Sequence, residues 1–158
     1  VRHRAPTEHP WACVVGVVQA AGRRRGEGLV HRGAFVAERP GDEAPWTALH
    51  QAFLAVAGDY EIARPELIRR FQIMAATPSV FARSLQLQAG WETAVADAMT
   101  VRLHTDSDDD VTPRLLAAAA LAAMRASLRH WLANGATTSL PALVTDCFKR
   151  LADGFKAR

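Results

Sequence analysis

The sequence has 158 residues, of which 49% are hydrophobic and 22% charged, and its formal net charge at pH 7 is +3. This length fits one principal domain with a sizeable core, and this composition excludes a generally disordered chain. A membrane-spanning helix is not expected, because the most apolar stretch, residues 115–124, is shorter than the roughly 18 residues required.

The first 40 residues differ in character from the rest of the chain. They carry scattered Pro and Gly, and the six arginines before residue 37 hold most of the excess positive charge. Their apolar stretch is brief and runs into Arg23, Arg24 and Arg25 instead of a cleavage site, so we read no export signal. A run this short is more often a solvated turn than a phosphate contact. We therefore separate residues 1–40 from a nearly neutral main domain, residues 41–158.

From residue 45 onward, apolar residues recur at helical spacing, and no stretch alternates with the period of a strand. We predict an all-α domain of about five helices. The first begins at Pro45, a favoured first-turn residue, and is expected to stop near Gly58. The second covers residues 65–76.

The third predicted helix, residues 78–103, would be on the order of 26 residues and about 39 Å long. Its apolar residues cover more than one narrow stripe, which is typical of a central helix with several neighbours. The acidic stretch 106–110 then makes a turn. A fourth, alanine-rich helix covers residues 113–133, and a fifth, capped by Ser139, ends at Gly154.

Short sequence motifs in these helices resemble those of the C-terminal domain of TetR-family transcriptional regulators, of the actinobacterial type that includes the mycofactocin-associated regulator. They are RPELIRR at residues 64–70, TP at 77–78, WE at 91–92 and WLA at 131–133. The resemblance covers about residues 38–155. It implies a TetR-like helical bundle that senses an effector and dimerises.

The resemblance also implies an N-terminal DNA-binding domain with a helix-turn-helix. None of its usual sequence motifs is intact here. Residues 15–22 are weakly similar to the helix that enters the turn, but Arg23 and Arg24 replace the turn residues. We expect residues 1–40 to be a truncated, frame-shifted or diverged DNA-binding segment. DNA binding is expected only if a helix-turn-helix is present or is supplied by a partner.

The family's sensing pocket lies among its middle helices, where this chain has many large apolar residues. Such residues, with Gln88 and Glu92 as polar members, would line a pocket for a small hydrophobic effector. The alternative is that the apolar residues are simply core and that Gln88, Glu92 and His130 face solvent or are satisfied locally. The candidate ligand-binding residues are Phe53, Phe71, Met74, Phe81, Gln88, Trp91, Glu92, Met99, Met124 and Trp131.

Dimerisation in the family comes from the last two helices, which pair with their copies into a four-helix bundle. One helix cannot bury both apolar stripes by itself, so we predict a homodimer. The alternative is that these stripes are internal core. The candidate interface residues are Leu115, Ala119, Ala122, Ala126, Leu140, Leu143, Val144, Phe148 and Leu151.

No sequence pattern predicts catalysis, a cofactor or a metal site. Cys13 and Cys147 are far apart without CxxC spacing, which favours a reducing, cytoplasmic setting. The D-x-D-x-D at residues 106–110 lacks the Gly and Glu that a calcium loop requires later in the loop. We therefore expect no enzyme, and turnover dependent on Glu92 or His130 would overturn this. The leading hypothesis is an effector-sensing homodimer; the rival is a helical homodimerisation module without a ligand.

Overall fold

The computed structural model describes Val36 and residues 38–105 and 109–154, so the predicted N-terminal segment lies almost entirely outside the described residues. The regular elements in this part of the chain are all helices, which confirms the all-α prediction. They are α3 (Pro45–Ile62), α4 (Arg64–Ala76), α5 (Pro78–Leu103), α6 (Thr112–Ala133) and α7 (Leu140–Ala152).

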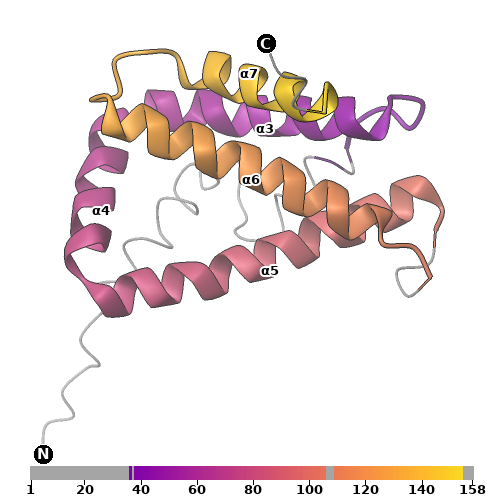
Figure 1. Ribbon diagram of the computed structural model, residues 1–158, viewed down its shortest axis with the longest axis horizontal. Helices are drawn as coiled ribbons and strands as arrows, with labels where there is room; N and C mark the ends of the chain where they lie inside the picture. The colour runs from indigo at the N-terminus through magenta and orange to yellow at the C-terminus, as the bar shows by residue number, and fades with distance from the viewer. Residues whose placement is uncertain (1–35, 37, 106–108, 155–158) are drawn as a thin grey trace, which may run out of the picture.

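The helices α3, α6 and α7 lie side by side, and α4 runs from them to the start of α5 (Figure 1). α7 packs on α3 and on α6, and α6 in turn packs on α5. The short helix α4 connects the end of α3 to the start of α5, and only Ala63 separates it from α3. In Figure 1, α5 and α6 lie close near the end of α5 and separate toward α4.

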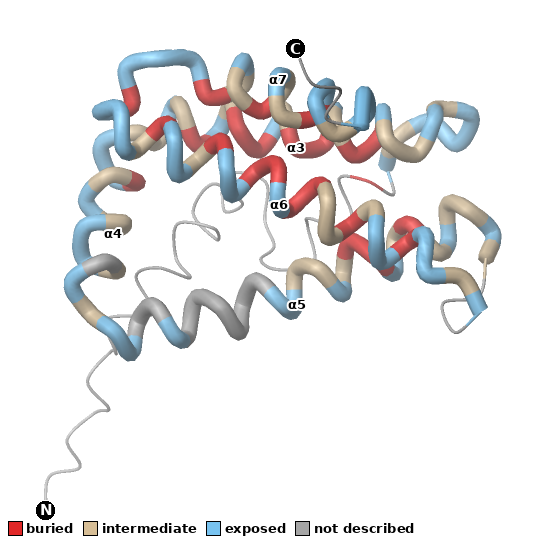
Figure 2. The backbone as a smooth tube through the Cα atoms, viewed as in Figure 1, coloured by how far each residue is buried: buried red, intermediate tan, exposed pale blue. Residues whose placement is uncertain are grey.

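The core is built from buried residues of α3, α6, α7 and the second half of α5. Figure 2 shows the buried positions on these helices turned toward one another, whereas α4 is mostly exposed or half-buried. The core also contains Val36, which is completely buried ahead of α3. These helices therefore hold most of the buried apolar residues in the described part of the chain. The burial of apolar surface is the main favourable contribution to folding.

The predicted end of the first helix at Gly58 is wrong, because α3 continues through it to Ile62. A glycine inside a helix costs roughly 1 kcal/mol relative to alanine. Continuing the helix places Tyr60 in the core, where only 6% of its surface is exposed. Burying an aromatic side chain outweighs the local cost of the glycine.

The other predicted helix boundaries agree with the structure to within two residues. α5 has the predicted 26 residues, and His104, which follows it directly, has a left-handed φ of 53°. Ser139 caps α7 as predicted, since its hydroxyl accepts a hydrogen bond from the Ala142 amide at 3.4 Å. Pro at the first or second helical position starts all five helices, consistent with its pre-set φ.

The acidic turn before α6 acts as a helix start where it is described. The Asp110 carboxylate accepts a hydrogen bond of 2.8 Å from the Thr112 amide, and the bonds from Thr112 lower the pKa of Asp110. Within residues 38–105 and 109–154, no three His, Cys, Asp or Glu side chains are grouped so that they could hold a metal ion. No described helix is long and apolar enough to cross a membrane.

Candidate functional site

Four of the ten predicted ligand-binding residues lie in the packed core. Phe53 is 3% exposed, Met124 4%, and Met99 and Trp131 are completely buried. They come from α3, α5 and α6 and belong to one cluster, against which Phe71 of α4 packs in part. Phe53, Met99, Met124 and Trp131 are therefore parts of one buried core, and Phe71 lies at its edge.

Trp131 is held at both its polar edge and its face. Its indole Nε1 donates a hydrogen bond of 2.8 Å to the carbonyl oxygen of Thr138, in the turn after α6. The guanidinium carbon of Arg64, at the start of α4, lies 5.7 Å from the ring centroid, within the range of a cation–π interaction. Trp131 thus joins α4, α6 and the turn that leads to α7.

Three further candidates lie outside the core cluster. Met74 of α4 and Trp91 and Glu92 of α5 are half-buried. Phe81 and Gln88 are on the same stretch of α5, but their side chains lie outside the described part of the structure. His130 is exposed at the end of α6, which confirms the alternative weighed for it. The ligand-binding role of the ten residues stays a prediction.

Sequence reasoning missed a basic side chain on the inner side of α4. Arg70 is only 15% exposed, and its Nε donates a hydrogen bond of 2.7 Å to the Glu66 carboxylate. Its Nη1 is buried and has no hydrogen-bond partner among the described residues. Arg70 lies four residues before Met74, so the two share one side of α4. This spacing is visible in the sequence, but an arginine in a polar sequence motif is normally expected to face solvent.

The predicted dimer interface divides into two groups, and three of the five predicted residues of α7 belong to the interior. Leu140 and Val144 are completely buried and Phe148 is 1% exposed. They have no surface left with which to contact a second copy, so the alternative of internal core describes them. Leu143 and Leu151 are half-buried and pack against the same core.

Phe148 is the centre of an aromatic cluster between α3 and α7. Its ring centroid lies 4.8 Å from that of Trp46, 4.9 Å from His50 and 5.9 Å from Phe53. Trp46 Nε1 also donates a hydrogen bond of 3.3 Å to the Phe148 carbonyl oxygen. This face of α7 therefore holds α3.

His50 adds a titratable group to this cluster. Its Nε2 lies 3.3 Å from the Thr145 hydroxyl, and its ring stacks on Phe148. Burial, and secondarily the positive charge of Lys149, lower the pKa of His50 below its ordinary value. Burial thus disfavours the charged form of His50 in the α3–α7 contact.

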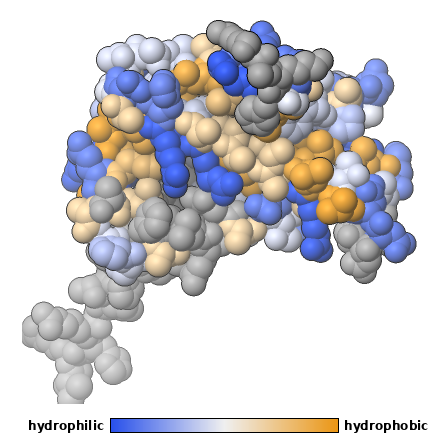
Figure 3. All heavy atoms as spheres, in the orientation of Figure 1, coloured by the Kyte–Doolittle hydropathy of each residue, from blue (hydrophilic) through white to orange (hydrophobic). Residues whose placement is uncertain are grey.

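The predicted interface residues of α6 lie on the outer face of that helix. Leu115 is 63% exposed, Ala122 and Ala126 are exposed, and Ala119 is half-buried. Val111, directly before α6, is 71% exposed. Figure 3 shows hydrophobic surface over the end of the molecule where α5 ends and α6 begins. These residues, unlike Leu140, Val144 and Phe148 of α7, are available to a second chain.

The sequence of this helical bundle matches a known domain family. The family described as the MftR C-terminal domain, which is a C-terminal domain of TetR type, matches residues 43–156. This range contains all five helices and well over half of the chain. A comparison with curated proteins found no match.

Proposed function

The chain belongs to the family of the MftR C-terminal domain, and from this premise we propose that its helical bundle is the effector-sensing and dimerising core of a TetR-like regulator. The proposed effector is a small hydrophobic molecule. The cytoplasmic setting expected from the cysteine content, and the expectation that the chain is not an enzyme, are part of the same proposal.

The contrast between α4 and the packed core is the observation that supports an effector site. Met74, Phe71 and Trp91 are large and apolar but remain half-buried. On the side of α4 that carries Met74, Arg70 offers a buried nitrogen that has no hydrogen-bond partner in the described part of the chain. A buried donor without an acceptor costs free energy, and a polar group of an effector would recover that cost. Apolar walls with a few polar groups are typical of small-molecule sites.

The effector site is tested by a thermal-shift screen of the full chain against small hydrophobic compounds. A compound present at about 100 times its Kd should stabilise the fold by about 2.7 kcal/mol. Met74→Trp, which fills the site, should abolish the shift. Ile73→Ala is the matched control, because Ile73 is 41% exposed on the same helix. Binding that survives in Met74→Trp, or a screen in which no compound binds, would exclude this site.

We propose that the outer face of α6 forms the dimer contact. Leu115, Ala122 and Ala126 provide the exposed apolar surface, and the alanines allow the backbones of two helices to approach closely. Leu115→Arg should convert a dimer into a monomer in analytical ultracentrifugation at micromolar concentration. The control is Arg114→Glu, at the exposed position just before Leu115. Leu143→Arg would not serve, because Leu143 packs on the core. A wild-type chain that is monomeric and folded would refute the proposal.

The rival function is a helical homodimerisation module without an effector, and one observation favours it. Phe53, Met99, Met124 and Trp131 are buried in a single cluster, as a filled core requires. The screen separates the two proposals, since only the sensor gains stability from a compound.

DNA binding is proposed only if a helix-turn-helix is present in the chain or is supplied by a partner, and a gel-shift assay with the DNA upstream of the gene tests it.

A further inference from the structure

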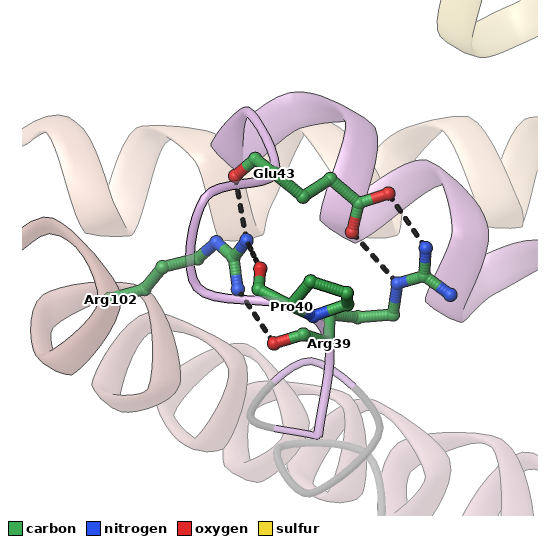
Figure 4. Close-up of polar contacts among 4 residues, drawn as sticks. All are labelled: Arg39, Pro40, Glu43 and Arg102. Atoms are coloured by element: carbon green, nitrogen blue, oxygen red, sulfur yellow. Dashed lines mark hydrogen bonds and ion pairs between the residues drawn. The ribbon is translucent and has the colours of Figure 1, made fainter.

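The guanidinium of Arg102, in the last turn of α5, binds the backbone of the segment that precedes α3 (Figure 4). Its Nη1 donates to the carbonyl oxygen of Arg39 at 3.4 Å. Its Nη2 donates to the carbonyl oxygen of Glu43 at 2.6 Å and also to that of Pro40. One side chain thus reaches three carbonyl groups that lie 59 to 63 residues away in the sequence.

The same segment, residues 38–44, is also held from within and at both ends. The Arg39 side chain forms two hydrogen bonds with the Glu43 carboxylate, at 2.7 and 2.8 Å. The Glu43 amide donates to the Pro40 carbonyl, and the Arg39 amide donates to that of Val36. Val36 is buried in the core on one side, and α3 begins at Pro45 on the other. Arg102 therefore binds a turn that is already ordered, and the entropy cost of holding it is small.

Arg102 shares a helical face with core residues of α5. Val95 and Met99 precede it by seven and three residues, which is the spacing of one stripe on a helix. Both are completely buried. Met99 is one of the candidate ligand-binding residues, and it is only about 4.5 Å from Arg102 along the helix axis. A displacement of this stripe would move the guanidinium with it.

We propose that Arg102 is a positioning residue that couples α5 to residues 38–44. When the stripe of Val95 and Met99 shifts, the three carbonyl bonds transmit the shift to the segment. As a signalling step this rests on the proposed effector function, because an effector that contacts Trp91 of α5 is what would displace this helix. The mechanical link itself is a property of the chain without any ligand.

The link is tested on the ligand-free full chain by NMR hydrogen exchange at two amides, that of Glu43, bonded to Pro40 within the segment, and that of Arg39, bonded to Val36 just before it. Arg102→Met keeps the apolar stem and removes the donors, and it should speed exchange at both amides by about tenfold or more. Arg102→Lys should give an intermediate rate, because an ammonium cannot bind through two branches. Arg69→Met, on the exposed face of α4, is the control and should leave both rates unchanged.

Coupling is tested by a double-mutant cycle with Met99→Ala. This variant should speed exchange at the Arg39 and Glu43 amides by about threefold when Arg102 is present and have no further effect in Arg102→Met. Met124→Ala is the matched control, because it removes the same atoms from a buried site on α6 and should not alter the two amides. Circular dichroism confirms that each variant retains its helices.

Two results would overturn the proposal. One is an unchanged exchange rate at the Arg39 and Glu43 amides in both Arg102 variants. The other is an effect of Met99→Ala that is equal with and without Arg102. If the cycle shows coupling while no compound binds in the thermal-shift screen, the effector function fails and the link stands.

Discussion

The bundle has two regions that use similar residues differently. Where α3, α6 and α7 meet, aromatic and aliphatic side chains are buried, and the indole groups of Trp46 and Trp131 each donate to a backbone carbonyl. On α4 and the adjoining part of α5, Phe71, Met74 and Trp91 are only half-buried. The first region is built for stability, and the second has spare apolar surface. The proposed effector site lies in the second region, and ligand-responsive segments of proteins are generally drawn from the less stable parts of a fold.

The comparison predicts its largest effect at Phe148, the centre of the aromatic cluster. Phe148→Ala should lower the free energy of unfolding by about 3 to 5 kcal/mol, since it removes the ring that packs on Trp46, His50 and Phe53 and leaves a cavity. Urea denaturation followed by circular dichroism, at fixed protein concentration, measures the change. A loss below about 1 kcal/mol would mean that this region is not the stable one.

A smaller effect is expected from the same kind of truncation on α4. Met74→Ala should cost less than about 2 kcal/mol, because its side chain is half-buried and truncating it removes less buried apolar surface than truncating a core residue. The same denaturation experiment measures it, with Met124→Ala as the fully buried counterpart. If the two methionine variants lose equal stability, the distinction between the regions is wrong.

The smallest effect should come from the titration of His50. This residue of α3 contacts Thr145 and Phe148 of α7 in the stable region. Because its pKa is lowered from 6.5 in the folded chain, the unfolded chain binds the proton more readily. Stability should therefore fall as the pH drops through about 6.5 and below, and His50→Gln should weaken this dependence. NMR titration of the His50 ring measures the pKa directly. A value above 6.5 would show that Lys149 and burial do not act as described.

The sequence alone determined the fold class, the order of the helices and most of their ends. Pro45, Pro78 and Ser139 are local signals, and a local signal needs no knowledge of the rest of the chain. It failed at Gly58, where the burial of Tyr60 outweighed a local preference. The resemblance to TetR-type domains was likewise visible in short words, and the family match over residues 43–156 agrees with it.

Only the tertiary structure decided what each apolar face contacts. An amphipathic stripe shows that a face is buried, but it does not show whether the neighbour is a helix of the same chain or of a second chain. The structure assigned Leu140, Val144 and Phe148 to the interior and left Leu115 exposed on α6. In the same way, Arg102 ended up bound to carbonyl groups about 60 residues earlier in the chain, a contact that no local spacing encodes because folding alone brings the two segments together.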